Sequence, residues 1–377
     1  MTKIIANCRL YTDPPGMLTH VAIEAGKIRD VLRKIPPGAD ILFDAGGMTA
    51  APGLIDTHVH GAGGGDLSDG SPEGFHTAAA ALCALGTTSF YATSFYLPGG
   101  ANRHLQRLGR ERPAKGEADC PGIHLEGPFI NPRKKGGIPA AYLADPDIAV
   151  LDDILARTRE KLALLTCAPE LPGMAEILRV CREKGIIASF GHSDAGTAET
   201  REGFARGMGC VTHLANAMRP FHHRDPGPLP AVLASGAPVQ LISDGVHLHA
   251  DAVRFFYDIF GAARCICITD GIECTGLPDG EYRFREKPYR SENGAVFYSD
   301  GSGLIGTSLS LFEIVMRFKE FTGCSLAEAI DAGSVNPARC MGIDDRKGYI
   351  KPGYDADMIF FGADHALRKV VKSGIVI

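Results

Sequence analysis

Short apolar segments of β type recur through the middle of the chain, and stretches compatible with helices separate them. The stretch that ends at Gly185 has apolar residues at helical spacing, and the glycine stands where a helix would stop. Eight alternations of strand and helix predict an α/β fold of the (β/α)₈ barrel type. The segments are GLIDTHVH (53–60), GTTSFYAT (86–93), GIHLE (122–126), LALLTCAPE (162–170), IIASFGH (186–192), GCVTHL (209–214), VQLISD (239–244) and CICITD (265–270).

The two ends of the chain differ from this middle. Residues 1–50 and 345–377 contain strand-like runs separated by turn residues, such as VAIEAG followed by KIRDVL, with Gly26 near the turn. We expect the two ends to form one small β-sandwich domain beside a barrel of residues 51–344. The chain of 377 residues is long enough for a barrel of about 250 residues and such a unit.

The composition narrows the class of protein. The net charge is −5, whereas general nucleic-acid binders tend to be basic, so we expect no nucleic-acid partner. The 11 cysteines are scattered without a CxxC pair, which favours a reducing compartment over a disulfide framework. The sequence contains no apolar run of about 18 residues and no secretory leader, so we predict a cytoplasmic protein without a membrane partner.

Residues with reactive side chains fall at or near the last position of several predicted strands. Barrel enzymes build their active sites at the carboxyl ends of the strands. Scattered surface residues have no reason to share this register, so we expect one site at that end of the barrel. Its candidate members are His58, His60, Glu126, His192, His213 and Asp270.

The first segment contains two imidazoles, His58 and His60, two residues apart. Along a strand this spacing sends both side chains to the same face, which is here the barrel interior. Two convergent neutral imidazoles suit zinc or a similar divalent ion, although an isolated HxH pair also arises by chance. The same segment therefore predicts one part of a metal centre.

Glu126, His192 and His213 are the second part of the predicted metal centre. Three such ligands leave room for a water molecule, which is the pattern of a catalytic zinc rather than of a structural one. The alternative for Glu126 is a solvated or capping carboxylate. His124 lies two residues earlier on the same face, and we expect it to form structural hydrogen bonds rather than to bind the metal.

Asp270 ends the eighth segment, directly after an apolar run that would bury the strand. A carboxylate next to water at a metal centre is the natural general base. The alternative is a turn or helix-capping aspartate, because Gly271 would also fit a turn.

Longer motifs resemble one known family, the N-acetylglucosamine-6-phosphate deacetylases of the amidohydrolase superfamily. The resemblance covers most of the chain in the right order, and HLEGPF and the NAM segment with HHR are its more specific parts. It implies a metal-dependent deacetylase that converts N-acetylglucosamine-6-phosphate to glucosamine-6-phosphate and acetate. The motifs are HLEGPFINPRKKG, FGHSDA, THLANAMRPFHHRDPG, SDGVHLH, ITDG, TGLPDGEYRF and NPARCMGIDDRKGYIKPGYDADMIFF.

The resemblance also implies roles for single residues. In the family, one divalent metal is held by residues matching Glu126, His192 and His213, and members with HxH hold a second. Zinc is the first expectation, with iron, manganese and cobalt as alternatives. The residue matching Asp270 is the general base and acid. In the family, the residues that match Asn216, Ala217, Arg224 and His247 contact the sugar and the phosphate. The family is typically dimeric, and a neighbouring subunit can supply part of the phosphate site.

Two positions depart from the family pattern. Ile138 stands where the family usually has a polar residue that holds the substrate carbonyl, and Glu273 adds a charge where small apolar residues are usual. These changes leave open a related substrate, such as N-acetylgalactosamine-6-phosphate or a cyclic amide. A non-catalytic homologue is the other alternative, and the filled ligand and base positions speak against it.

Overall fold

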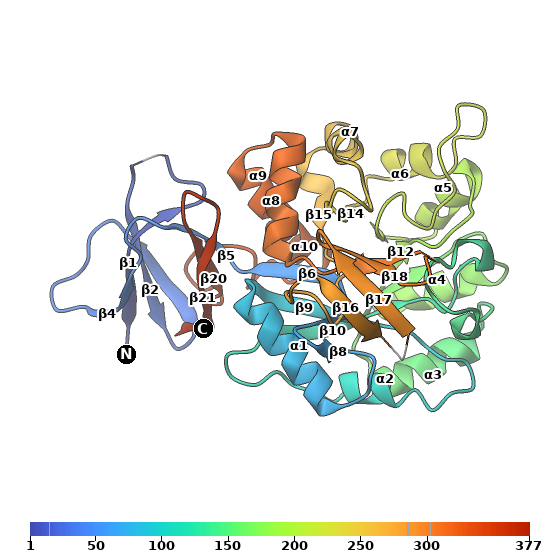
Figure 1. Ribbon diagram of the computed structural model, residues 1–377, viewed down its shortest axis with the longest axis horizontal. Helices are drawn as coiled ribbons and strands as arrows, with labels where there is room; N and C mark the ends of the chain where they lie inside the picture. The colour runs from blue at the N-terminus through green and yellow to red at the C-terminus, as the bar shows by residue number, and fades with distance from the viewer. Residues whose placement is uncertain (15, 285–286, 302) are drawn as a thin grey trace.

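The computed structural model describes residues 1–14, 16–284, 287–301 and 303–377, which form a barrel and a smaller β unit (Figure 1). The expected barrel is confirmed. Eight parallel strands pair in the order β15-β14-β13-β12-β11-β10-β9-β6, so neighbours in the sheet are also neighbours in the chain. These strands are β6 (Leu54–Val59), β9 (Thr87–Ser94), β10 (Asp119–Glu126), β11 (Leu162–Cys167), β12 (Ile187–Phe190), β13 (Cys210–Val211), β14 (Val239–Leu241) and β15 (Cys265–Cys267).

The first and last strands of this sheet meet through the residues that follow β15. Gly271 forms a parallel bridge with Val59, and the amide of Asp270 donates to the carbonyl of His58 at 2.9 Å. This contact closes the sheet into a barrel. Backbone pairing therefore places two of the predicted site segments next to each other.

Helices cover the outside of the barrel, and local sequence explains where they form. Helix α4 buries Ile177, Leu178 and Cys181, which recur at the spacing of one helical face. Helix α1 begins after Ser71, whose side chain accepts a hydrogen bond from the amide of Gly74. Among the described residues, no helix has the length and apolar character needed to cross a membrane. The helices are α1 (Pro72–Ala84), α2 (Arg103–Leu108), α3 (Ile148–Thr158), α4 (Met174–Glu183), α5 (Thr197–Ala205), α6 (Leu229–Ser235), α7 (Ala250–Phe260), α8 (Leu311–Thr322), α9 (Leu326–Gly333) and α10 (Val335–Cys340).

The two ends of the chain combine into the smaller β unit. Strand β1 pairs with β2 from Lys3 to Cys8, with β4 from Lys3 to Ala6, and with β5 through Arg9 and Leu10. Strand β5 pairs in turn with β20, and side chains from both ends, such as Ile5 and Phe360, share one buried core. The predicted domain limits at residues 50 and 345 stay a prediction. The strands are β1 (Lys3–Leu10), β2 (Thr19–Glu24), β3 (Lys27–Leu32), β4 (Asp40–Asp44), β5 (Thr49–Pro52), β20 (Met358–Phe361), β21 (Leu367–Lys372) and β22 (Ile375–Val376).

A buried group of charges joins this unit to the barrel. The ammonium of Lys347 lies 2.6 Å from carboxylate oxygens of both Asp119, at the start of β10, and Asp357, just before β20. Lys372, the last residue of β21, contacts the same two carboxylates at 3.0 and 3.1 Å. Both lysines and Asp357 are buried, so these three charges are paired where water has little access, whereas the side chain of Asp119 is 38% exposed.

A four-stranded antiparallel sheet between β15 and α8 is an addition that the sequence analysis did not predict. It lies in front of the barrel in the view of Figure 1. Its central turn, Asn293-Gly294, has both residues at positive φ, as a two-residue type I′ hairpin requires. Its strands are β16 (Gly280–Phe284), β17 (Lys287–Glu292), β18 (Ala295–Tyr298) and β19 (Leu304–Thr307). The remaining short elements are β7 (Gly61–Ala62), β8 (Gly65–Asp66), η1 (Pro132–Lys134), η2 (Ala140–Tyr142) and η3 (Ala262–Arg264).

Candidate metal centre and active site

A cavity of about 370 Å³ lies where the barrel strands end. Most residues of the predicted metal centre line it, and His58 lies beside them with no exposed side-chain surface. Strands that are far apart in the sequence therefore deliver these side chains to one place, as the shared register predicted. The members that line the cavity are His60, Glu126, His192, His213 and Asp270.

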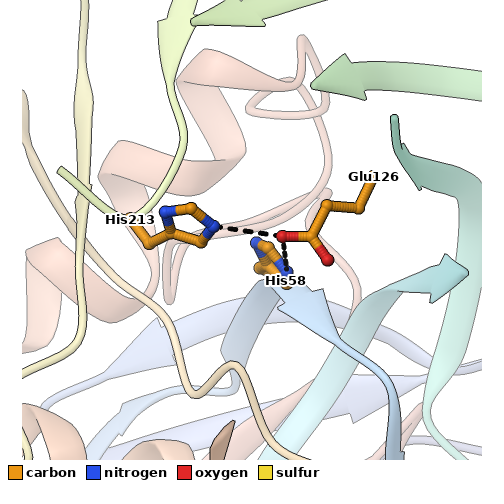
Figure 2. Close-up of side chains that lie close together, drawn as sticks. All are labelled: His58, Glu126 and His213. Carbon is orange, nitrogen blue, oxygen red and sulfur yellow. Dashed lines mark hydrogen bonds and ion pairs between the residues drawn. The ribbon is translucent and has the colours of Figure 1, made fainter. Parts of the chain in front are cut away.

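Glu126, the last residue of β10, is the point on which the histidines converge. Its Oε1 lies 2.9 Å from Nε2 of His192 and 3.0 Å from Nε2 of His213. The Nε2 of His58 is 3.5 Å from the same oxygen. Figure 2 shows the side chains of His58, in β6, and His213, in the segment after β13, pointing at this carboxylate.

Asp270 occupies the other side of the same cluster. Its Oδ1 lies 3.2 Å from Nε2 of His58 and 3.4 Å from Nε2 of His60, and these two nitrogens are 3.2 Å apart. The Asp270 side chain is 16% exposed, whereas that of His58 is fully buried. The carboxylate is therefore the member of this pair that a molecule in the cavity can reach.

Three of these residues adopt left-handed backbone conformations just after their strands. The φ angles are 48° for His192, 28° for His213 and 50° for Asp270. This region is uncommon for residues other than glycine, and such conformations persist where the surrounding fold enforces them. The chain thus departs from strand geometry at the positions where these side chains turn into the cavity.

The carboxylates and imidazoles strongly perturb one another. Burial disfavours a charged imidazole, yet the charges of Asp270 and Glu126 outweigh burial and raise the pKa of His58 to about 10. Burial also opposes ionisation of Asp270, but the neighbouring His58 holds the pKa of that carboxyl well below its usual range. The two carboxylates therefore create a field that attracts positive charge to the centre of the cluster.

The donor atoms fit a divalent metal. The Nδ1 of His192 lies 2.7 Å from the Lys134 carbonyl, which can only accept, so this nitrogen carries a proton. Its Nε2 then points either a second proton or a lone pair toward Glu126. A lone pair would repel the carboxylate unless a cation lay between them. The described residues contain two such groups of possible ligands around the cavity: His58, Glu126 and His213, and His58, His60 and Asp270.

His124 and Asp56 lie behind this cluster. Both ring nitrogens of His124 have protein partners, the carbonyl of Thr57 at 2.9 Å and the hydroxyl of Thr166 at 2.8 Å. This arrangement fits the structural role expected for His124. Asp56 is fully buried and accepts a hydrogen bond from the hydroxyl of Thr269 at 2.6 Å, which links the first strand to the segment before Asp270.

An aromatic wall of the cavity was not predicted from the sequence. Phe95, just after β9, stacks on the ring of His60 with centroids 5.0 Å apart, and Tyr142 packs edge-on against Phe95 at 6.0 Å. Both aromatic side chains line the cavity. The position of Phe95 near the end of a predicted strand could have marked it as a cavity residue. No local pattern in the sequence marks Tyr142.

The predicted substrate contacts are divided between two places. Asn216, Ala217 and His247 line the cavity. Arg224 lies in an exposed loop and is not among the residues that line it. Among the described residues of one chain, the guanidinium that the family resemblance implies for the phosphate therefore lies outside the cavity.

The two departures from the family pattern have different surroundings. Ile138 is buried and lines the cavity, so it does stand in the candidate site. Glu273 is not among the described residues that line the cavity, and an effect of its charge on the choice of substrate stays a prediction. Its side chain faces Tyr289, where burial and a hydrogen bond with Glu273 raise the pKa of the phenol.

The sequence profile of the amidohydrolase family matches residues 49–376, and the chain belongs to this family. An N-acetylglucosamine-6-phosphate deacetylase of Lysinibacillus sphaericus is 35% identical over 357 residues, which cover 94% of this chain and 92% of the relative. An N-acetylgalactosamine-6-phosphate deacetylase of Escherichia coli O157:H7 is 31% identical, and the match covers 95% of each protein. These relatives confirm the predicted resemblance.

The fold comparison agrees with the sequence comparison. A solved structure of an N-acetyl-D-glucosamine-6-phosphate deacetylase mutant from Mycobacterium smegmatis, in complex with N-acetyl-D-glucosamine-6-phosphate, matches with a TM-score of 0.90. The two chains are 27% identical, and the match covers 100% of this chain and 98% of that one. The likeness therefore extends over both the barrel and the smaller β unit.

Proposed function

We propose that this chain is a metal-dependent deacetylase that hydrolyses the acetamido group of N-acetylglucosamine-6-phosphate to glucosamine-6-phosphate and acetate. The observation that supports it most is the convergence of imidazole nitrogens on Glu126, with Asp270 beside them in the wall of a cavity. Hydrolysis of a carbon–nitrogen bond is the activity for which the relatives are named, and a metal centre with this donor set can catalyse it.

In this proposal Glu126, His192 and His213 hold the main divalent metal, and His58 and His60 contribute a second position. Zinc is the first choice because imidazole and carboxylate ligands suit it, and iron, manganese or cobalt have compatible chemistry. A divalent cation bound there would polarise the amide carbonyl and make water a stronger nucleophile. The field of the two carboxylates, which raises the pKa of His58, supports cation binding at this point.

Asp270 performs the proton transfers. Its low pKa keeps the carboxylate ionised at neutral pH, so it accepts a proton from the attacking water. As the oxygen–carbon bond forms and the carbon–nitrogen bond breaks, Asp270 returns that proton to the leaving nitrogen. Phe95 and Tyr142 line the cavity next to His60, and they limit the access of bulk water to the reacting amide.

The sugar phosphate is held away from the reacting amide. Asn216 and Ala217 contact the sugar through polar groups of the segment after His213, and His247 contacts the phosphate. Arg224 completes the phosphate site from a second copy of the chain in a homodimer, because its own loop leaves it outside the cavity. Binding energy from the distal phosphate then orients the amide against the catalytic groups.

The test is acetate release by protein loaded with a divalent metal, with N-acetylglucosamine-6-phosphate and the unphosphorylated sugar compared side by side. We expect a strong preference for the phosphorylated sugar. Turnover of neither sugar by protein with confirmed metal content would contradict the proposal.

A second candidate substrate is N-acetylgalactosamine-6-phosphate. The supporting observation is Ile138, which lines the cavity where a polar residue is usual, together with the match to the Escherichia coli relative. The same assay with both sugar phosphates separates the two epimers, because the true substrate has the higher kcat/KM.

A further inference from the structure

The four-stranded sheet between β15 and α8 contributes a wall to the cavity that contains Asp270. Lys287 from β17 and Tyr298 from β18 line it, with Leu304 and Ile305 from β19. The Asp270 backbone is tied to this sheet, because its carbonyl accepts a hydrogen bond from the amide of Thr307 at 3.2 Å. The sheet is therefore fixed against the candidate site by its last strand.

The charges that line the cavity are unevenly distributed. Lys287 is the one lysine or arginine among the described residues of the lining, and Arg224 is absent from it. His60, His192 and His213 face the carboxylates of the metal centre. Among the residues that the structure describes, Lys287 therefore carries the ammonium group that one chain offers to a ligand in the cavity.

Contacts within the sheet hold Lys287 at the cavity wall. Its ammonium lies 5.2 Å from the ring centroid of Tyr298, within the range of a cation–π interaction. The strands β17 and β18 are paired antiparallel, and the amide of Ser299 donates to the carbonyl of Pro288 at 3.1 Å. Tyr298 pairs with Tyr289, so Lys287 lies two residues further along the same face of β17, within reach of the ring of Tyr298.

We propose that Lys287 is a specificity-determining residue that recognises the phosphate of the substrate from within the same chain, with Tyr298 as its positioning residue. This inference rests on the proposed function, since it names the group that selects the phosphorylated sugar. An ammonium forms strong charge-assisted hydrogen bonds with phosphate oxygens, and it makes no such bond with a neutral hydroxymethyl group. Lys287 thus discriminates between sugar phosphate and free sugar.

The experiment compares the variants K287M and K287R with wild type in the metal-loaded protein. The first readout is the ratio of kcat/KM for N-acetylglucosamine-6-phosphate to that for N-acetylglucosamine. The second is calorimetric binding of glucosamine-6-phosphate, which requires no turnover. The matched control is K369M, because Lys369 is an exposed lysine placed over an aromatic ring, Phe43, at 5.6 Å in the smaller β unit.

We expect K287M to lower the ratio and to weaken product binding by about tenfold, the usual effect of removing one charge-assisted hydrogen bond. K287R retains the charge and should recover most of the loss, and K369M should match wild type. A ratio and an affinity in K287M that stay within about twofold of wild type would overturn the inference, because a lost ion contact exceeds that change. Absence of turnover by wild type refutes the proposed function instead, and the binding data then decide on Lys287 separately.

Discussion

Asp244 holds the ring of His247 in a fixed orientation. Its Oδ2 lies 2.6 Å from Nδ1 of His247, and its Oδ1 accepts hydrogen bonds from the amides of Val246 and His247 at 2.9 and 2.8 Å. Asp244 is buried, whereas His247 lines the cavity. The carboxylate therefore keeps a proton on Nδ1 and leaves Nε2 as the ring nitrogen available to a ligand.

Replacing Asp244 by alanine should weaken substrate binding more than it slows the catalytic step. We expect D244A to raise KM for the sugar phosphate by about tenfold, because the ring of His247 loses its orientation. The change in kcat should be smaller. Steady-state kinetics check this. The control is D251A, because Asp251 pairs with His249 at a distance of 3.4 Å and both side chains are exposed. A loss confined to kcat would contradict the positioning role.

Asp270→Asn should separate catalysis from metal binding. The amide cannot accept a proton, so acetate release should fall by about 100-fold or more. Metal content measured by elemental analysis should stay near that of wild type. Full activity in D270N would remove Asp270 from the mechanism.

Unlike Asp270→Asn, Glu126→Gln should lower the metal content of the protein. Its carboxylate oxygen is the convergence point for His192 and His213, so loss of the charge should lower bound metal and activity together. Adding excess divalent metal should recover part of the activity of E126Q and none of that of D270N. Equal metal retention in the two variants would contradict the division of roles.

Mixing two impaired variants tests whether Arg224 acts across a dimer. In a heterodimer of R224A and D270N, one site combines an intact Asp270 with an intact Arg224 from the other subunit. We expect refolded mixtures to recover roughly a quarter of the wild-type rate with the sugar phosphate, since half the dimers are mixed and each has one complete site. Activity no higher than the sum of the separate variants would mean that Arg224 does not act in trans.

The charge cluster between the barrel and the smaller β unit should make the fold sensitive to acid. Asp355 also belongs to this cluster, because its Oδ2 lies 3.1 Å from the ammonium of Lys347. Burial opposes ionisation of Asp355, but Lys27 and Lys347 outweigh it and lower its pKa to about 2. The pKa of Asp119 is also lowered, because Lys347 and Lys372 outweigh burial. Carboxyls with depressed pKa values stabilise the fold above about pH 4 and lose that contribution as the pH falls toward about 2.

Urea unfolding midpoints at pH 6, 4 and 3 measure this dependence. We expect the midpoint to fall between the last two, and K347M to be less stable at pH 6 because it leaves buried carboxylates with fewer partners. The acid-induced loss should be smaller in K347M than in wild type. Identical pH profiles would show that other groups control acid stability.

Part of the candidate site followed from local sequence. His58 and His60 share a face because a strand has a period of two, and Gly127-Pro128 ends β10 directly after Glu126. The sheet β16–β19 was missed although Asn293-Gly294 signals a hairpin, because a hairpin signal gives no information about what the sheet covers.

The sequence by itself determined the barrel and the set of ligand-type residues at its strand ends. Both depend on short-range periodicity, which repeats in every βα unit. Only the tertiary structure decided that Phe95 stacks on His60, that Lys287 lines the cavity and that Arg224 does not. These outcomes depend on how the barrel closes and where an inserted sheet packs, and long-range contacts of that kind leave no local pattern in the chain.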